Sequence, residues 1–204
     1  MAFMVSEQGG SKFPPIEQGT HQAVCFGLVD VGTHFNQMFG KSSHEAVILW
    51  ELPEERITIK DQDLPRTVSK SYTLSLGEKA NLYKDLVSWR GKTFSSQELE
   101  GFDLKNILGV NSMLQIIHKT KGDRTYANIS AILPLYKGMT PKVAETPILY
   151  FSFADTPSIP DVMPGWIKER IMSSDEWKAM EEQSSPAART NVPVQVDYED
   201  DVPF

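Results

Sequence analysis

The sequence predicts a mainly β protein: a five-stranded β-barrel with a helical insert between its third and fourth strands. Stretches rich in β-branched and aromatic residues alternate with Gly- and Pro-containing breaks between residues 19 and 136. One stretch in the middle changes from the two-residue period of a strand to the period of a helix. The 204 residues, 40% hydrophobic and 23% charged, suffice for one domain with a full core plus terminal segments.

Three strands are expected before the helix. The first alternates apolar and polar residues and should end at Gly32. The second is apolar on both faces, and Pro53 should stop it because proline lacks the N–H that a sheet ladder needs. The third carries serine and threonine on one face and larger side chains on the other. These strands are residues 19–31, 44–52 and 66–76, separated by a loop at 32–43 and a polar connection at 54–65.

The helix is expected to begin at Ser75, with Glu78 three residues later as in a capping box. A broad apolar face follows at helical spacing, and Gly91 should end the helix. Residues 94–108 then form an irregular insert with one or two short turns, one of them capped by Ser95.

The remaining chain should form a hairpin and a C-terminal extension. Prolines interrupt the sequence repeatedly beyond Gly138, so the strands there should be short. We expect strands at 110–119 and 125–136 joined by a tight basic turn at 119–124, an edge strand within 148–153, and one amphipathic helix at 166–182.

This order of elements is that of an OB-fold, a partly open five-stranded barrel that usually carries a helix between strands three and four. A split barrel or a mixed α+β sandwich would give the same order, and both stay open. The expected organisation is a flexible N-terminal arm at 1–17, the OB-fold domain at 18–153, an extension with a helix at 154–183, and a linker with a disordered acidic tail at 184–204.

A net charge of −7 is unusual for a nucleic-acid-binding protein, but the charge is segregated along the chain. Residues 66–142 hold twelve basic and six acidic residues, a net charge of +6, whereas the C-terminal segments are acidic. Phosphate binding depends on the local field rather than on the total charge. The charge pattern is therefore compatible with a body that binds nucleic acid.

Aromatic and basic residues interleave at the predicted ligand-binding end of the barrel. OB-folds bind ligands through strands two and three and through the 1–2 and 4–5 loops. Aromatic rings stack on any base, while cations follow the phosphates of a single strand. The candidates for DNA binding are Phe35, Phe39 and Lys41 in the 1–2 loop, Trp50 in strand two, Arg66, Lys70 and Tyr72 in strand three, and Lys119, Lys121, Arg124 and Tyr126 at the 4–5 turn.

Some of these candidates have structural alternatives. Trp50 lies in a strand without a polar face, which favours burial, and Tyr72 fits core packing as well as DNA contact. An ordinary solvated hairpin tip is the alternative for the basic turn, but its position at the predicted ligand-binding end favours DNA contact. Phe35 and Phe39 lie in a polar loop, where a structural role is harder to find, so they are the preferred stacking residues.

The last eight residues combine acid with an apolar tip. Such a segment cannot fold alone, but an aromatic ring, a terminal carboxylate and a run of acids suit a peptide ligand for a basic pocket. A solubilising acidic tail is the alternative. The partner-binding candidates are Asp197, Glu199, Asp200, Asp201, Val202, Pro203 and Phe204. Their order resembles the acidic tip of bacterial single-stranded DNA-binding proteins.

The body resembles phage-encoded single-stranded DNA-binding proteins over roughly residues 18–153. The resemblance implies an OB-fold, sequence-independent binding of single-stranded DNA, and a tail that recruits replication or recombination proteins. Bacterial proteins of this type are tetramers. That oligomeric state cannot be inferred for this chain, because it has a longer helical insert and lacks a long Gly/Gln-rich linker. The segments that carry the resemblance are 47–53 (VILWELP), 71–76 (SYTLSL) with Lys79 and Ala80, 89–92 (WRGK), 101–104 (GFDL), 108–109 (LG) and 131–135 (AILPL).

Sequence motifs for other chemistry are not found. The chain has no Gly-rich phosphate loop, its four histidines lack zinc-ligand spacing, and Cys25 in an apolar run reads as a buried thiol. We therefore expect no enzyme activity, no cofactor and no metal. A single cysteine fits a reducing compartment, and with no visible signal peptide or membrane span we expect a cytoplasmic protein, in the host bacterium if phage-encoded.

The resulting hypothesis is a non-enzymatic single-stranded DNA-binding protein in phage DNA replication, recombination and repair. The tail and DNA are both polyanions, so the tail could occupy the DNA groove when DNA is absent; whether it does so stays open. The alternatives are an OB-fold protein–protein adaptor that never touches DNA and a metal-dependent nuclease using the acids of 54–63. Whether the chain acts as a homo-oligomer or a cooperative array on DNA, and whether it prefers DNA over RNA, stays open.

Overall fold

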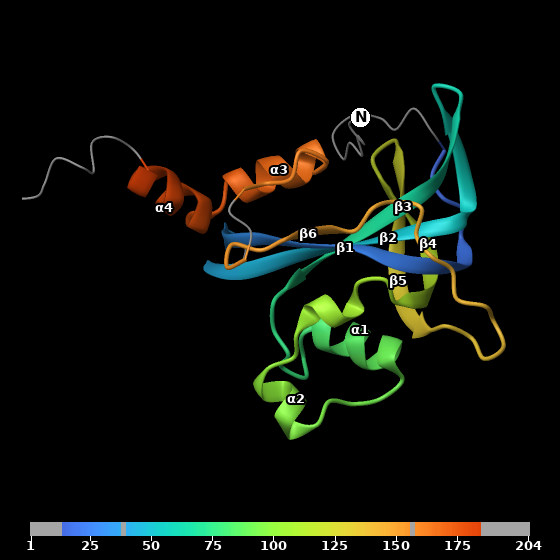
Figure 1. Ribbon diagram of the computed structural model, residues 1–204, viewed down its shortest axis with the longest axis horizontal. Coiled ribbons are helices and arrows are strands. Elements are labelled where there is room, and N and C mark those ends of the chain that lie inside the picture. The colour runs from blue at the N-terminus through green and yellow to red at the C-terminus, as the bar shows by residue number, and fades with distance from the viewer. Residues whose placement is uncertain (1–13, 38–39, 156–157, 185–204) are drawn as a thin grey trace, which may run out of the picture.

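Two long strands, β1 (Gly19–Asn36) and β2 (Lys41–Ile59), form the centre of the sheet in the computed structural model (Figure 1). The structure describes residues 14–37, 40–155 and 158–184. The strands lie in the order β3-β2-β1-β4-β5 with antiparallel neighbours, and β6 pairs with β1 in parallel. The other strands are β3 (Gln62–Thr73), β4 (Asn111–Lys121), β5 (Arg124–Pro134) and β6 (Leu149–Phe151).

β1 and β2 continue through the residues that were expected to end them. The register of the β1–β2 ladder shifts between Asp30 and Gly32, so a bulge accommodates Gly32 and the strand runs on to Asn36. Likewise the β2–β3 ladder is interrupted between Leu52 and Arg56. Pro53 lies in this gap, where its missing N–H breaks no ladder bond. The expected loop at 32–43 and connection at 54–65 are therefore wrong: both are mostly hairpin.

The β1–β2 pair is buried on both faces, as the sequence of the second strand indicated. Alternate residues of a strand point to opposite faces, so Ile48 and Trp50 join one core while Val47 and Leu49 join the other. The first core packs against α1 (Asn81–Arg90). The second packs against β6 and α3 (Gly165–Met172). Figure 1 shows α1 and α3 on opposite sides of the sheet.

The helix boundaries follow local capping. α1 begins after Ala80 rather than at Ser75, whose Oγ instead accepts a hydrogen bond from the Gly77 N–H at 3.2 Å. It ends at Gly91, which takes the left-handed conformation (φ 66°) as expected. Ser95 and Glu98 form the capping box of α2 (Ser96–Glu100). A 3₁₀ turn, η1 (Leu104–Ile107), precedes β4.

The single helix expected at 166–182 is two helices, α3 and α4 (Asp175–Ser184). Ser174 separates them: its hydroxyl donates to the Ile171 carbonyl oxygen at 2.7 Å and accepts from the Trp177 N–H at 3.2 Å. It thus closes one helix and caps the next.

Residues 14–17, within the expected flexible arm, pack against the sheet. Ile16 is buried in the first core, and its carbonyl oxygen lies 2.7 Å from His118 Nε2. The Arg66 guanidinium donates to the Pro14 carbonyl oxygen at 2.6 Å. These contacts tie the start of the described chain to both β3 and β4.

The mainly β class is confirmed, whereas closure into a barrel is not. β3 and β5 are the edges of the ladder order, and they contact each other, but within the described ranges no ladder pairs them. The described chain forms an open, mainly antiparallel sheet with helices on both sides.

Gly32 of β1 packs tightly against the α3–α4 junction. An added Cβ there would lie 2.5 Å from Ser174 Cβ, and the backbone φ is +79°. We expect Gly32→Ala to lower the free energy of unfolding by about 1–3 kcal/mol more than Gly122→Ala. The control shares the left-handed conformation (φ +60°) but has open space around it. Urea denaturation of both variants measures the difference; equal losses would contradict the close packing.

Candidate nucleic-acid interface

Four of the candidate DNA-binding residues lie together on one face of the β4–β5 hairpin. The ladder pairs Lys119 with Tyr126 and Lys121 with Arg124. Directly opposed residues in an antiparallel pair share a face, and so do residues two apart on one strand. We call Lys119, Lys121, Arg124 and Tyr126 the hairpin patch.

The hairpin patch is exposed and carries three basic side chains. All four side chains are exposed, with 36% of Tyr126 accessible. Within the ranges that the structure describes, none of the three cations has an ion-pair partner. A solvated hairpin tip would look similar in charge, but here a ring and three cations face the same way. The arrangement can contact a base and several phosphates at once.

The base of the hairpin is fixed by the core. Ile116 and Ile129 are buried in the first core. The His118 N–H donates to the Gln18 side-chain oxygen at 3.1 Å. Gly122, with φ +60°, supplies the left-handed conformation that a two-residue turn needs. The hairpin patch therefore projects from a rigid support.

A second group of candidates lies around a hollow at the end of the β1–β2 hairpin. Phe35, on β1 rather than in a loop, is 62% exposed and lines a hollow of about 480 Å³, the Phe35 hollow. A hollow of about 510 Å³ adjoins it and shares Glu45; its lining includes hydroxyl-bearing residues of β3 and Lys79. Lys41 is exposed at the start of β2. This region offers an aromatic ring in a mostly polar surface.

The Phe35 hollow also contains a residue that sequence reasoning missed. Arg170 of α3 forms an ion pair with Glu45 and donates to Ser71 Oγ at 2.8 Å. In the chain, Arg170 is 125 residues from Glu45 and 99 residues from Ser71. No local pattern could have indicated the contact.

The OB-fold prediction implied that the two groups line one groove, but the structure places them apart. β4 pairs with the beginning of β1, where Gly19 lies opposite Ile116, whereas Phe35 lies at the other end of β1. None of the hairpin-patch residues is among those that line the Phe35 hollow. The hairpin patch therefore belongs to the hairpin whose strand β4 pairs with the start of β1, and the Phe35 hollow lies at the end of β1.

Trp50 and Tyr72 are not available for stacking, which corrects two of the candidates. Trp50 is fully buried, with its ring centroid 5.7 Å from that of Trp89. Tyr72 is 3% exposed, and its hydroxyl donates to the Asp85 carboxylate at 2.8 Å. Burial, with Asp85 beside it, raises the pKa of Tyr72 above its usual value. Both rings belong to the first core.

Two basic candidates on β3 are engaged within the protein. Lys70 Nζ lies 2.6 Å from the Asp85 carboxylate, and Arg66 is held by the Pro14 carbonyl oxygen. A phosphate would have to compete with these partners. They are weaker candidates than the cations of the hairpin patch.

The remaining candidates lie outside the described residues. These are Phe39 in the β1–β2 turn and the partner-binding tail residues Asp197, Glu199, Asp200, Asp201, Val202, Pro203 and Phe204. Their assignment stays a prediction.

Three of the acids considered for a nuclease lie beside basic side chains. Glu54 lies 2.6 Å from Lys142 Nζ, Asp63 2.8 Å from Arg56, and Glu55 3.0 Å from His21. In the described part of the chain no group of His, Cys, Asp or Glu is arranged to hold a metal ion. Cys25 is buried in the first core, as expected, and this burial raises the pKa of its thiol to about 12.

Comparison with known proteins identifies no relative. No protein-family model matches the chain, and neither the curated proteins nor the solved structures include a significant match. Of the described helices, none is long and apolar enough to cross a membrane. The functional argument therefore rests on the geometry of the chain itself.

The two tyrosines among the candidates should respond differently to loss of their hydroxyl. Tyr72→Phe leaves Asp85 without one donor and should lower the free energy of unfolding by about 0.5–1.5 kcal/mol. Tyr126→Phe should change stability by less than about 0.5 kcal/mol, because its side chain is exposed. Chemical denaturation of the pair checks this. A Tyr72→Phe protein as stable as the wild type would contradict the structural role.

Proposed function

We propose that the protein binds single-stranded DNA, without base preference, through the hairpin patch. The observation that carries the proposal is the cross-strand pairing that places Lys119, Lys121, Arg124 and Tyr126 on one exposed face. Three unpaired cations can neutralise neighbouring phosphates while the tyrosine ring stacks on a base. Neither contact reads a base edge, so little sequence preference is expected.

The strand order supports an OB-type barrel as the framework of this function. The order β3-β2-β1-β4-β5, with the two edge strands in contact, is compatible with a partly open five-stranded barrel. In such a barrel the 4–5 loop contributes to ligand binding. The hairpin patch surrounds this loop.

The biological setting follows from the resemblance in sequence and is equally a proposal. A body that binds single strands would protect DNA in a phage-infected bacterium. An acidic, Phe-terminated tail would recruit replication or recombination proteins. In this account the protein is not an enzyme and needs no cofactor. The binding groups are side chains and the tail is a peptide ligand.

An adaptor that binds proteins through the Phe35 hollow is the second candidate. The observation in its favour is the exposed ring of Phe35 beside the Arg170–Glu45 pair, since aromatic and Arg residues are enriched in protein interfaces. The adaptor reading predicts no oligonucleotide binding through the hairpin patch.

Removing the charges of the hairpin patch should weaken DNA binding and its salt dependence together. We expect the variant Lys119→Ala, Lys121→Ala, Arg124→Ala to bind a labelled thymidine oligonucleotide of about 30 nucleotides at least 10-fold more weakly at about 0.1 M salt. The slope of log K against log salt should become less steep by about 2, since each phosphate contact contributes about 0.7 for single strands. Fluorescence anisotropy across a salt series measures both.

A matched control removes three cations elsewhere. Lys84, Lys168 and Lys178 are exposed on α1, α3 and α4, and within the described ranges none forms an ion pair. Their triple alanine variant has the same net charge as the hairpin variant and should keep nearly wild-type affinity. Equal weakening in both variants would mean that total charge, not the hairpin patch, governs binding.

The ring of Tyr126 should contribute through stacking rather than through charge. Tyr126→Ala is expected to cost about 1–3 kcal/mol of binding free energy while leaving the salt slope unchanged. Tyr136→Ala removes another exposed tyrosine, outside the hairpin, and should have no effect. The same titrations check both, and indistinguishable losses would remove Tyr126 from the site.

A further inference from the structure

The helix α4 is held to the body by few contacts. Most of its described side chains are exposed, and only Glu176 and Trp177 are half-buried. Trp177 packs at the border of the second core. The polar attachment of α4 to the sheet therefore depends on Glu176.

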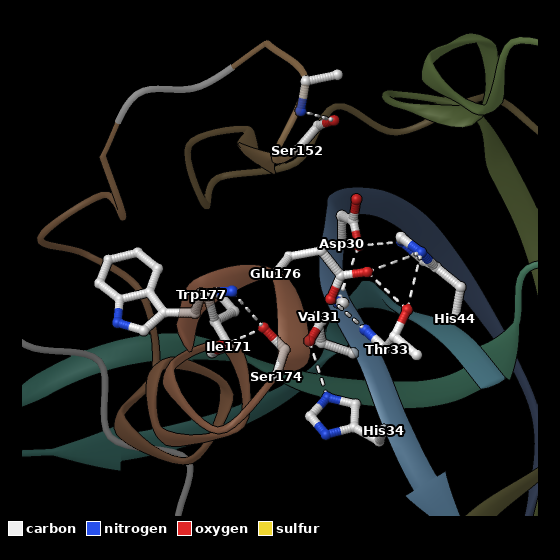
Figure 2. A network of polar contacts seen from close by, with 12 residues as sticks. Asp30, Val31, Thr33, His34, His44, Ser152, Ile171, Ser174, Glu176 and Trp177 are labelled. Carbon is white, nitrogen blue, oxygen red and sulfur yellow. Dashed lines mark hydrogen bonds and ion pairs between the residues drawn. The ribbon is translucent and has the colours of Figure 1, made fainter. Parts of the chain in front are cut away.

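Glu176 uses both carboxylate oxygens to bind one residue of β1. The Thr33 N–H donates to Oε2 at 2.6 Å, and the Thr33 hydroxyl donates to Oε1 at 2.6 Å. Figure 2 shows this contact beside His44, which comes from β2. The helix, β1 and β2 thus meet at one polar network.

His44 lies between two carboxylates of this network. Its Nε2 is 2.7 Å from Asp30 Oδ1, and its Nδ1 is 3.4 Å from Glu176 Oε1 (Figure 2). A neutral imidazole has one N–H and can donate to only one of them, while its other nitrogen presents a lone pair to the second. An imidazolium donates to both carboxylates and carries a charge of opposite sign.

We infer that His44 is a pH-responsive latch that fastens α4 to the β1–β2 hairpin when protonated and loosens it when neutral. The geometry that carries the inference is the position of the imidazole between Asp30 of β1 and Glu176 of α4. The Thr33 hydroxyl also lies 3.4 Å from His44 Nδ1. The bond from the Thr33 backbone N–H to Glu176 Oε2 involves no atom of the ring and does not depend on its protonation. Deprotonation therefore weakens the attachment of α4 rather than abolishing it.

The charged groups around the latch set the direction of the effect. Asp30 and Glu176 are the acids facing the ring, and the adjacent Glu45 is paired with Arg170 of α3. Burial acts to raise the pKa of Glu176, but the Thr33 hydrogen bonds outweigh it and hold that pKa below its usual value. The carboxylate is therefore charged at both pH 6 and pH 8. An imidazolium donates to both acids and a neutral imidazole to only one, so the attachment of α4 is stronger at the lower pH.

The latch adjoins the Phe35 hollow. Thr33, the residue that Glu176 binds, precedes Phe35 on β1 by two positions, and Arg170 of α3 lines the same hollow. Loosening α4 therefore frees one side of the strand end that carries Phe35. The inference does not depend on DNA binding.

Hydrogen–deuterium exchange of the intact protein tests the latch. Exchange of residues 175–184 is measured between pH 6 and pH 8 and corrected at each pH for the intrinsic chemical rate. We expect wild-type α4 to lose about fivefold in protection across this range, the difference between a charge-assisted and a neutral hydrogen bond. His44→Gln, which cannot titrate, should show no such loss.

His34→Gln is the matched control, because His34 Nε2 contacts the Val31 carbonyl oxygen at 2.8 Å instead of a carboxylate. It should keep the wild-type pH dependence, and peptides from the β1–β2 ladder report whether each variant is folded. The latch is overturned if wild-type α4 is equally protected at both pH values. It is also overturned if His44→Gln shows the wild-type change, or if the ladder loses protection in parallel with α4.

Discussion

The constraint on which the rest of the structure depends is the burial of both faces of the β1–β2 pair. A sheet exposed on one side needs one covering layer, whereas Val47, Ile48, Leu49 and Trp50 in succession require two. The chain supplies α1 on one side, and β6 with α3 on the other. Even the buried Glu51 is satisfied by this arrangement, accepting hydrogen bonds from the backbone N–H groups of Glu145 and Thr146 at 2.9 and 2.7 Å.

Covering both faces leaves the ends of the hairpins as the places where chemistry can reach solvent. The aromatic rings of the strand centres, Trp50 and Tyr72, contribute to packing. Among the candidate residues, exposed rings occur instead at Tyr126 on the β4–β5 hairpin and at Phe35 near the end of β1. Binding sites at the hairpin ends can differ in charge without disturbing either core. The cationic hairpin patch and the polar Phe35 hollow differ in this way.

The local order of elements could be predicted from the sequence, but the contacts between distant segments could not. Runs of β-forming residues located the five main strands, and Gly91 and Ser95 marked a helix end and a helix start correctly because capping is a local interaction. Gly32 and Pro53 were misread as strand ends, since a bulge and a ladder gap can absorb such residues only when neighbouring strands are known. The hairpin patch was predictable because its members are close in sequence. Arg170 and Glu176 reach β1, β2 and β3 from more than 90 residues away, and no period or motif signals such contacts.

The central claim is that the exposed cations and ring of the hairpin patch bind single strands. The most direct measurement is a titration of the wild-type protein with a thymidine oligonucleotide of about 30 nucleotides and with a duplex of equal length, from low to moderate salt. The account predicts tight binding to the single strand that weakens steeply with salt, and much weaker binding to the duplex, whose bases are not available for stacking. No binding to the single strand at low salt, in the full chain and in a chain lacking residues 197–204 alike, would contradict it.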